Sequence, residues 1–162
     1  MARIKTEGVA DVAVMFGKAA AASTPIAKMM VYDGARVMAD EIKRETASLT
    51  ADKERFLKPG EKYAVITSRD RKDLAAHLGI TKITKGVSGV RAVIGFAGYG
   101  SKRTHKYKKG LPMAMLARSL MKGTIVREKS AFIDRSVSRA GDMAEEAMAK
   151  TGEKVIAQIF AE

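Results

Sequence analysis

The sequence predicts an α+β protein in which a long helix and a carboxy-terminal helix pack on a small antiparallel β-sheet. Apolar residues recur at helical spacing over residues 25–48 and again over residues 131–160. Between these segments, residues 80–84 and 89–96 alternate in polarity on either side of a glycine-containing connection, which is the pattern of a β-hairpin. Helices at both ends of the chain with a hairpin between them indicate the α+β class.

The 162-residue chain fits one domain, in which residues 1–24 are expected to form a helical arm and residues 25–162 the core. Apolar spacing predicts a modest helix over residues 7–22, and Ser23-Thr24-Pro25 predicts a break after it. Thr24 suits the N-cap of the next helix and Pro25 its first position. That second helix, which runs to about residue 48, is expected to be roughly 35 Å long.

Weaker patterns follow between the long helix and the hairpin. Residues 50–60 are charged and end in Pro59-Gly60, which predicts a loop with a turn. Residues 62–67 are β-prone, and residues 69–77 are expected to form a short helix that Gly79 ends.

Two more helices are expected after the hairpin. Residues 113–121 are apolar at helical spacing and are followed by Gly123. Ser130 suits the N-cap of the last helix, over residues 131–160. Glycine weakens a helix by about 1 kcal/mol relative to alanine, so a bend or fraying is expected near Gly152.

Composition excludes several classes of site. The chain has no cysteine, which removes disulfides, thiolate metal sites and cysteine nucleophiles, and is typical of proteins that fold in a reducing cytoplasm. The amino-terminal residues lack the pattern of a signal peptide, and no run approaches the roughly 20 apolar residues of a membrane span. No contact with a membrane is therefore expected.

No catalytic, cofactor or metal site can be assembled from the sequence. His77 and His105 lie far apart, and neither has a second ligand at metal-binding spacing. The glycine-rich residues 95–102 do not match a phosphate-binding P-loop, and no nucleophile elbow is present. The protein is therefore expected not to be an enzyme and to need no cofactor.

Positive charge is the strongest feature of the composition. Lysine and arginine number 30 against 18 acidic residues, a net charge of +12. The charge is densest in SKRTHKYKK, residues 101–109, which is expected to be a mobile loop because glycines bracket it. Basic residues around an aromatic one suit phosphate contacts with occasional stacking, although the pattern is of low specificity and more often belongs to a solvated loop, or to one that binds acidic residues of another protein. The candidate contact residues are Lys102, Arg103, Lys106, Tyr107, Lys108 and Lys109.

The ten methionines favour a packed core, and a subunit interface is the alternative because methionine side chains are flexible and polarisable. The candidate interface residues lie on the last two predicted helices. They are Met113, Leu116, Leu120, Phe132 and Ile133.

Five segments, in this order, resemble the neck or head-tail joining proteins of long-tailed phages, a family often labelled tail completion or minor tail morphogenesis proteins. They are GARVMADEIKRET at 34–46, DLAAHLGITKI at 73–83, VRAVIGFAGY at 90–99, ARSLMKGT at 117–124 and SAFIDRSV at 130–137. No single segment is a catalytic fingerprint, so the resemblance depends on order and spacing. The chain departs from the family at Ala131, where a proline is frequent, and at Arg71-Lys72-Asp73-Leu74, where Thr-Gly-x-Leu is frequent.

The resemblance implies a structural virion protein, present in the host cytoplasm during assembly, that forms a ring in the neck around the DNA channel. The implied partners are further copies of the chain, with a hexamer favoured over a dodecamer, head-closure or connector proteins, tail terminator or tail tube proteins, and genomic DNA in the lumen. Two alternatives stay open. One is a tail terminator ring, and the other is a small basic nucleic-acid-binding protein of the cytoplasm.

Overall fold

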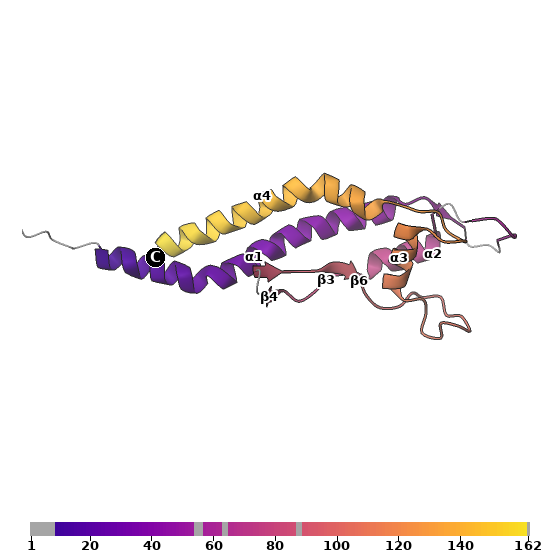
Figure 1. The fold of residues 1–162 in the computed structure, drawn as a ribbon, viewed down its shortest axis with the longest axis horizontal. Coiled ribbons are helices and arrows are strands. Elements are labelled where there is room, and N and C mark those ends of the chain that lie inside the picture. Colours follow the sequence, from indigo (N-terminus) through magenta and orange to yellow (C-terminus); the bar gives the residue numbers. More distant parts are fainter. Residues whose placement is uncertain (1–8, 54–56, 63–64, 87–88, 162) are drawn as a thin grey trace, which may run out of the picture.

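Two long antiparallel helices dominate the computed structural model, which describes residues 9–53, 57–62, 65–86 and 89–161. Helix α1 (Val9–Ser48) and helix α4 (Phe132–Ala161) pack along each other and form a stem (Figure 1). A two-stranded ribbon, residues 78–97, lies on the side of α1 opposite α4. The head, made of the described residues within 49–77 and 98–131, lies at the end of the stem away from the start of α1 and the end of α4. The predicted α+β class is confirmed.

The two stem helices approach closely because each has a glycine where the other has a methionine. A Cβ atom at Gly34 would lie 2.6 Å from Met148 Cγ, and one at Gly152 would lie 3.1 Å from Met30 Cε. Ala140 is also buried on this side of α4. Gly152 is therefore a packing position, and α4 continues past it to Ala161, so the expected fraying at Gly152 was wrong.

Helix α1 does not break at Pro25, which corrects the prediction of two helices there. Proline inside a helix removes one backbone hydrogen bond and costs about 3 kcal/mol. Packing offsets this cost, because Ile26 is buried and Met30 lies on Gly152 one turn later. Thr24 is not an N-cap either, since it lies inside α1. Its hydroxyl instead accepts a hydrogen bond from Lys85 Nζ at 3.1 Å.

The predicted hairpin is present as an antiparallel ribbon in two parts. Strand β3 (Leu78–Ile80) pairs with β6 (Ile94–Phe96), and β4 (Thr84–Gly86) pairs with β5 (Gly89–Arg91).

The two parts of the ribbon differ in register by one residue. Thr81 N donates to Val93 O at 2.8 Å in line with the first part, whereas Thr84 is opposite Arg91 in the second. Lys82 and Ile83 together therefore lie opposite the single residue Ala92. Two residues of one strand opposite one residue of its partner define a β-bulge. A bulge increases the local twist of a ribbon, as the wrapping of this ribbon along α1 requires.

The head contains short elements around one apolar core. Strands β1 (Ala51–Asp52) and β2 (Ile66–Thr67) pair in parallel, unlike the rest of the sheet structure. Helix α2 (Ser68–Ala76) follows β2 directly, and helix α3 (Met113–Lys122) ends at Gly123. No described helix is both long and apolar enough to cross a membrane.

Most of the residues that were expected to form a subunit interface are buried in the core of the head. Met113, Leu116, Leu120 and Phe132 are fully buried, and Ile133 packs against them. The rings of Phe132 and Phe96 lie 6.2 Å apart between centroids, so the ribbon is joined to the same core. Apolar periodicity predicted burial correctly, but the burial is within the chain, and the interface prediction was wrong at these four positions.

Candidate nucleic-acid interface

The basic loop, residues 101–109, has a closed base formed by two glycines. Gly100 N donates to Leu111 O at 2.8 Å, next to the bridge between Tyr99 and Pro112. Gly110 has φ +101°, and a Cβ atom there would collide with Gly100 O. Only glycine fits this position, because the backbone there is left-handed and the two ends of the loop, at Gly100 and Gly110, are in close contact.

Hydrogen bonds also define the interior of the basic loop. Thr104 and Tyr107 exchange two of them, Thr104 N to Tyr107 O and Tyr107 N to Thr104 Oγ1, each at 3.1 Å. Asp73 of α2 accepts from both the amide and the hydroxyl of Ser101, at 2.7 and 2.8 Å. The loop is therefore attached to α2 at one end and folded on itself at its centre.

The five cations of the basic loop are all exposed, whereas Tyr107 is half-buried. The Tyr107 hydroxyl donates to Met115 Sδ at 3.6 Å, a weak hydrogen bond that places the ring beside α3. Lys106 Nζ lies 5.7 Å from the centre of this ring, within the range of a cation–π contact. Tyr107 thus presents an aromatic surface among flexible cationic side chains.

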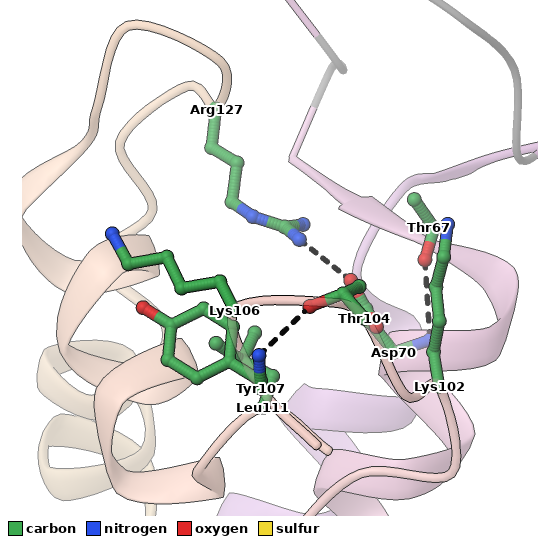
Figure 2. A pocket seen from close by; sticks show the side chains of 8 residues that line it. All are labelled: Thr67, Asp70, Lys102, Thr104, Lys106, Tyr107, Leu111 and Arg127. Carbon is green, nitrogen blue, oxygen red and sulfur yellow. Dashed lines mark hydrogen bonds and ion pairs between the residues drawn. The ribbon is translucent and has the colours of Figure 1, made fainter.

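Three of these residues, Lys102, Lys106 and Tyr107, line a cleft of about 370 Å³ between the loop and α2 (Figure 2). The side chains of Lys102 and Lys106 lie on opposite sides of the view, with the Arg127 guanidinium between them. The full lining consists of Thr67, Asp70, Lys102, Thr104, Lys106, Tyr107, Leu111 and Arg127. Arg103, Lys108 and Lys109 are exposed on the same loop outside this lining.

Arg127 belongs to this cleft although no sequence pattern indicated it. Its guanidinium donates to Asp70 Oδ2 at 2.6 Å, and both side chains are mostly buried, at 12% and 14% exposure. Asp70 lies in the first turn of α2, where Thr67 Oγ1 accepts from its amide at 3.2 Å and caps the helix. Arg127 is held from its own side by a tight turn in which Thr124 N donates to Arg127 O at 2.9 Å. The cleft therefore contains one cation whose position is fixed by an ion pair.

Charge is strongly segregated over the molecule. Among the residues that the structure describes, the head has 15 basic residues against 5 acidic ones, whereas the two stem helices together have 9 basic and 10 acidic residues. The ribbon adds 3 basic residues and no acidic one. The whole net charge of +12 is thus concentrated on one end of the protein and on the ribbon beside it.

The histidines have no common site. His77 lies at the end of α2, where Nδ1 is 2.7 Å from Asp73 O and the ring packs against Gly98, so its role is structural. His105 is exposed in the basic loop. Among the described residues, no group of three or more acidic, histidine or cysteine side chains could hold a metal ion.

Comparison with protein-family models, with curated proteins and with solved structures found no match.

Proposed function

We propose that this protein is a structural, non-enzymatic virion subunit of a tailed phage, and that its copies form a ring in the neck, around the DNA channel between head connector and tail. The ordered resemblance of five segments to neck proteins suggests the family. The segregation of charge between head and stem is the structural observation that carries the proposal. A ring around DNA needs a basic surface for the polyanion, and it needs separate surfaces at which its copies touch without repulsion.

The stem meets the second requirement. Its helices have nearly balanced charge, so two stems can approach without the repulsion that two heads would experience. The stem also exposes large apolar side chains, each between 41% and 60% exposed, which suit contacts between subunits. They are Met29, Tyr32, Val137, Met143, Ile156 and Phe160. These residues replace the buried ones as candidates for the subunit interface.

The head meets the first requirement. Its basic loop and the turn that carries Arg127 are joined to α2 by hydrogen bonds and an ion pair, so their cations are held on one surface. In a closed ring every head has the same orientation, so these surfaces form a continuous positive band. Such a band would face the DNA in the channel, and the hexamer is favoured because it matches the symmetry of the tail.

Charge reversal in the basic loop tests this function. Lys106, Lys108 and Lys109 are replaced together by glutamate in the phage, and a matched control carries glutamate at Lys82, Lys85 and Arg91, which are exposed on the ribbon, away from the proposed stem interface. The loop variant is expected to lower the yield of infectious particles and to leave DNA-filled heads apart from tails, because the band has lost its charge. The control is expected to lower the yield far less. Equal and normal yields from both variants would exclude a role of the loop in head-tail joining.

The basic head also favours a second function, a small nucleic-acid-binding protein free in the cytoplasm. The two functions differ in where the chain is found after purification. A neck subunit stays with particles through nuclease treatment and density-gradient separation, whereas a free binding protein is lost. A tail terminator ring would also be retained, and it is separated from a neck ring by its position in the particle.

A further inference from the structure

The cleft beside the basic loop has both a cationic and an apolar part. Lys102, Lys106 and Arg127 supply the cations, and the only carboxylate of the lining, Asp70, is engaged by Arg127 at 2.6 Å. The Tyr107 ring and Leu111 supply the apolar part. A ligand that fits must therefore carry an anionic group next to an uncharged, largely hydrocarbon group.

Two further depressions, each with more basic than acidic residues in its lining, adjoin this cleft. Arg127 lines a second one, of about 440 Å³, together with Lys62, Lys122 and Lys129 and one carboxylate, Glu128. A third, of about 360 Å³, lies at the start of α2 and is lined by Arg69, Lys72, Ser101 and one carboxylate, Asp73, which accepts from Ser101. Ser101 is the neighbour of Lys102 in the basic loop, so the three depressions follow one another over the surface of the head.

The row of depressions favours a regular polyanion over a short acidic peptide. DNA presents a negative charge at every nucleotide, so neighbouring phosphates can occupy neighbouring basic sites. Each phosphate is attached to a deoxyribose, whose hydrocarbon surface suits the apolar part of the cleft. An acidic peptide would satisfy one cleft but would leave the remaining cations of the row without a ligand.

We infer that the cleft binds one phosphodiester group of a DNA strand, with Lys102, Lys106 and Arg127 around the phosphate and the deoxyribose against Tyr107 and Leu111. The strand continues across Arg127 into the second depression. Contact is with the backbone alone, so binding is independent of base sequence. This inference rests on the proposed function, since it names the group of the channel DNA that the head contacts.

The salt dependence of DNA binding tests the role of the cations. Fluorescence anisotropy with a short labelled DNA duplex gives the dissociation constant of the full chain over a range of salt concentrations. Each phosphate contact contributes roughly 0.9 to the slope of log affinity against log salt concentration. Lys106→Ala is expected to lower that slope by roughly this amount and Lys106→Arg to restore it, whereas Lys43→Ala on the stem, with the same loss of charge, leaves it unchanged.

The apolar part of the cleft is tested separately. Tyr107→Ala is expected to weaken binding several-fold with no change in the salt slope, because it removes deoxyribose contact and no phosphate contact. Tyr99→Ala is the matched control, since Tyr99 is 51% exposed in the head but does not line the cleft. Circular dichroism of each variant confirms that the chain is folded. Equal effects of the Tyr107 and Tyr99 variants would overturn the assignment of the sugar site.

Competition separates DNA from an acidic protein as the ligand. Poly-L-glutamate at the same charge concentration is expected to displace the labelled duplex far less well than unlabelled DNA. If it displaces the duplex equally and loses its effect in Lys106→Ala, the cleft belongs to an acidic protein and the inference is wrong. If Lys106→Ala and Lys43→Ala change DNA binding alike, binding is by overall charge and the inference is also wrong. Neither result changes whether the chain is retained in particles, which decides the proposed function.

Discussion

Two buried glutamates hold the stem helices in register. Glu45 is 6% exposed, and its carboxylate accepts from Arg135 Nε at 2.9 Å and from an amino group of Arg139. Glu41, 8% exposed, accepts from Arg44 at 2.6 Å on its own helix and lies 3.9 Å from Arg139 Nη1 of α4. Both arginines on α4 contact Glu45 in this alignment of the helices, so the pairs favour this register and stabilise the stem.

Replacing Glu45 with alanine is expected to lower the free energy of unfolding by about 2 kcal/mol, because it removes two charge-assisted hydrogen bonds from a buried position. Glu146→Ala is the matched control. It removes an exposed ion pair with Lys150 in α4, and its expected cost is below about 0.5 kcal/mol. Urea denaturation followed by circular dichroism measures both, and similar costs would show that the Glu45 pairs do not stabilise the stem.

The residues that line the cleft show how far sequence reasoning reaches at this scale. Lys102, Lys106 and Tyr107 were identified because a run of basic residues with an aromatic one is visible in the sequence itself. Arg127 and Asp70 were missed. They are 57 positions apart, and each is an ordinary charged residue among others until the fold brings them to 2.6 Å.

At the scale of elements, the reciprocal pairs of glycine and methionine set the distance between α1 and α4. Gly34 lies under Met148 with Ala144 O also close, at 3.2 Å from where its Cβ atom would be. The methionine can move but the backbone oxygen cannot. Gly34 is therefore the less tolerant of the two glycines, and Gly152, whose three nearest atoms all belong to the flexible Met30 side chain, is the more tolerant.

Alanine at Gly34 is expected to lower the free energy of unfolding by about 1–2 kcal/mol, because overpacking outweighs the gain in helix propensity. The double variant Gly34→Ala with Met148→Ala is expected to recover part of the loss. Gly141→Ala is the control within α4, where a Cβ atom would have no neighbour within 4 Å, and it should stabilise the protein by up to about 1 kcal/mol. Thermal and urea denaturation give the three values. A stabilising Gly34→Ala would contradict close packing at this point.

Elements were predicted where periodicity is strong and local. The helices that became α3 and α4 and the hairpin follow from spacing that involves only near neighbours in the chain, whereas α2 was predicted from a weaker pattern. The break at Pro25 was wrong because the local cost of proline competes with tertiary packing, and Ile26 and Met30 provide that packing. The bulge in the ribbon could not be predicted, since register depends on which residues of two strands face each other.

At the scale of the whole molecule, the distribution of charge is the feature that links fold to function. The sequence gives the net charge of +12, but a net charge is compatible with a uniformly positive surface. The fold brings the residues of the head together at one end and leaves a stem of balanced charge. This separation predicts two interactions with different salt dependence: contacts of the head with polyanions weaken as salt rises, and contacts between apolar stem surfaces do not.

Cryo-electron microscopy of phage particles that carry this chain tests the central proposal most directly. The account predicts a closed ring of this subunit at the head-tail junction, with six copies and with the basic loop and Arg127 facing the DNA density in the channel. A ring found at the junction between neck and tail tube would instead make the chain a tail terminator. If the junction contains no density that fits the long two-helix stem, the proposal of a neck subunit is contradicted, and nucleic-acid binding by the free protein takes its place.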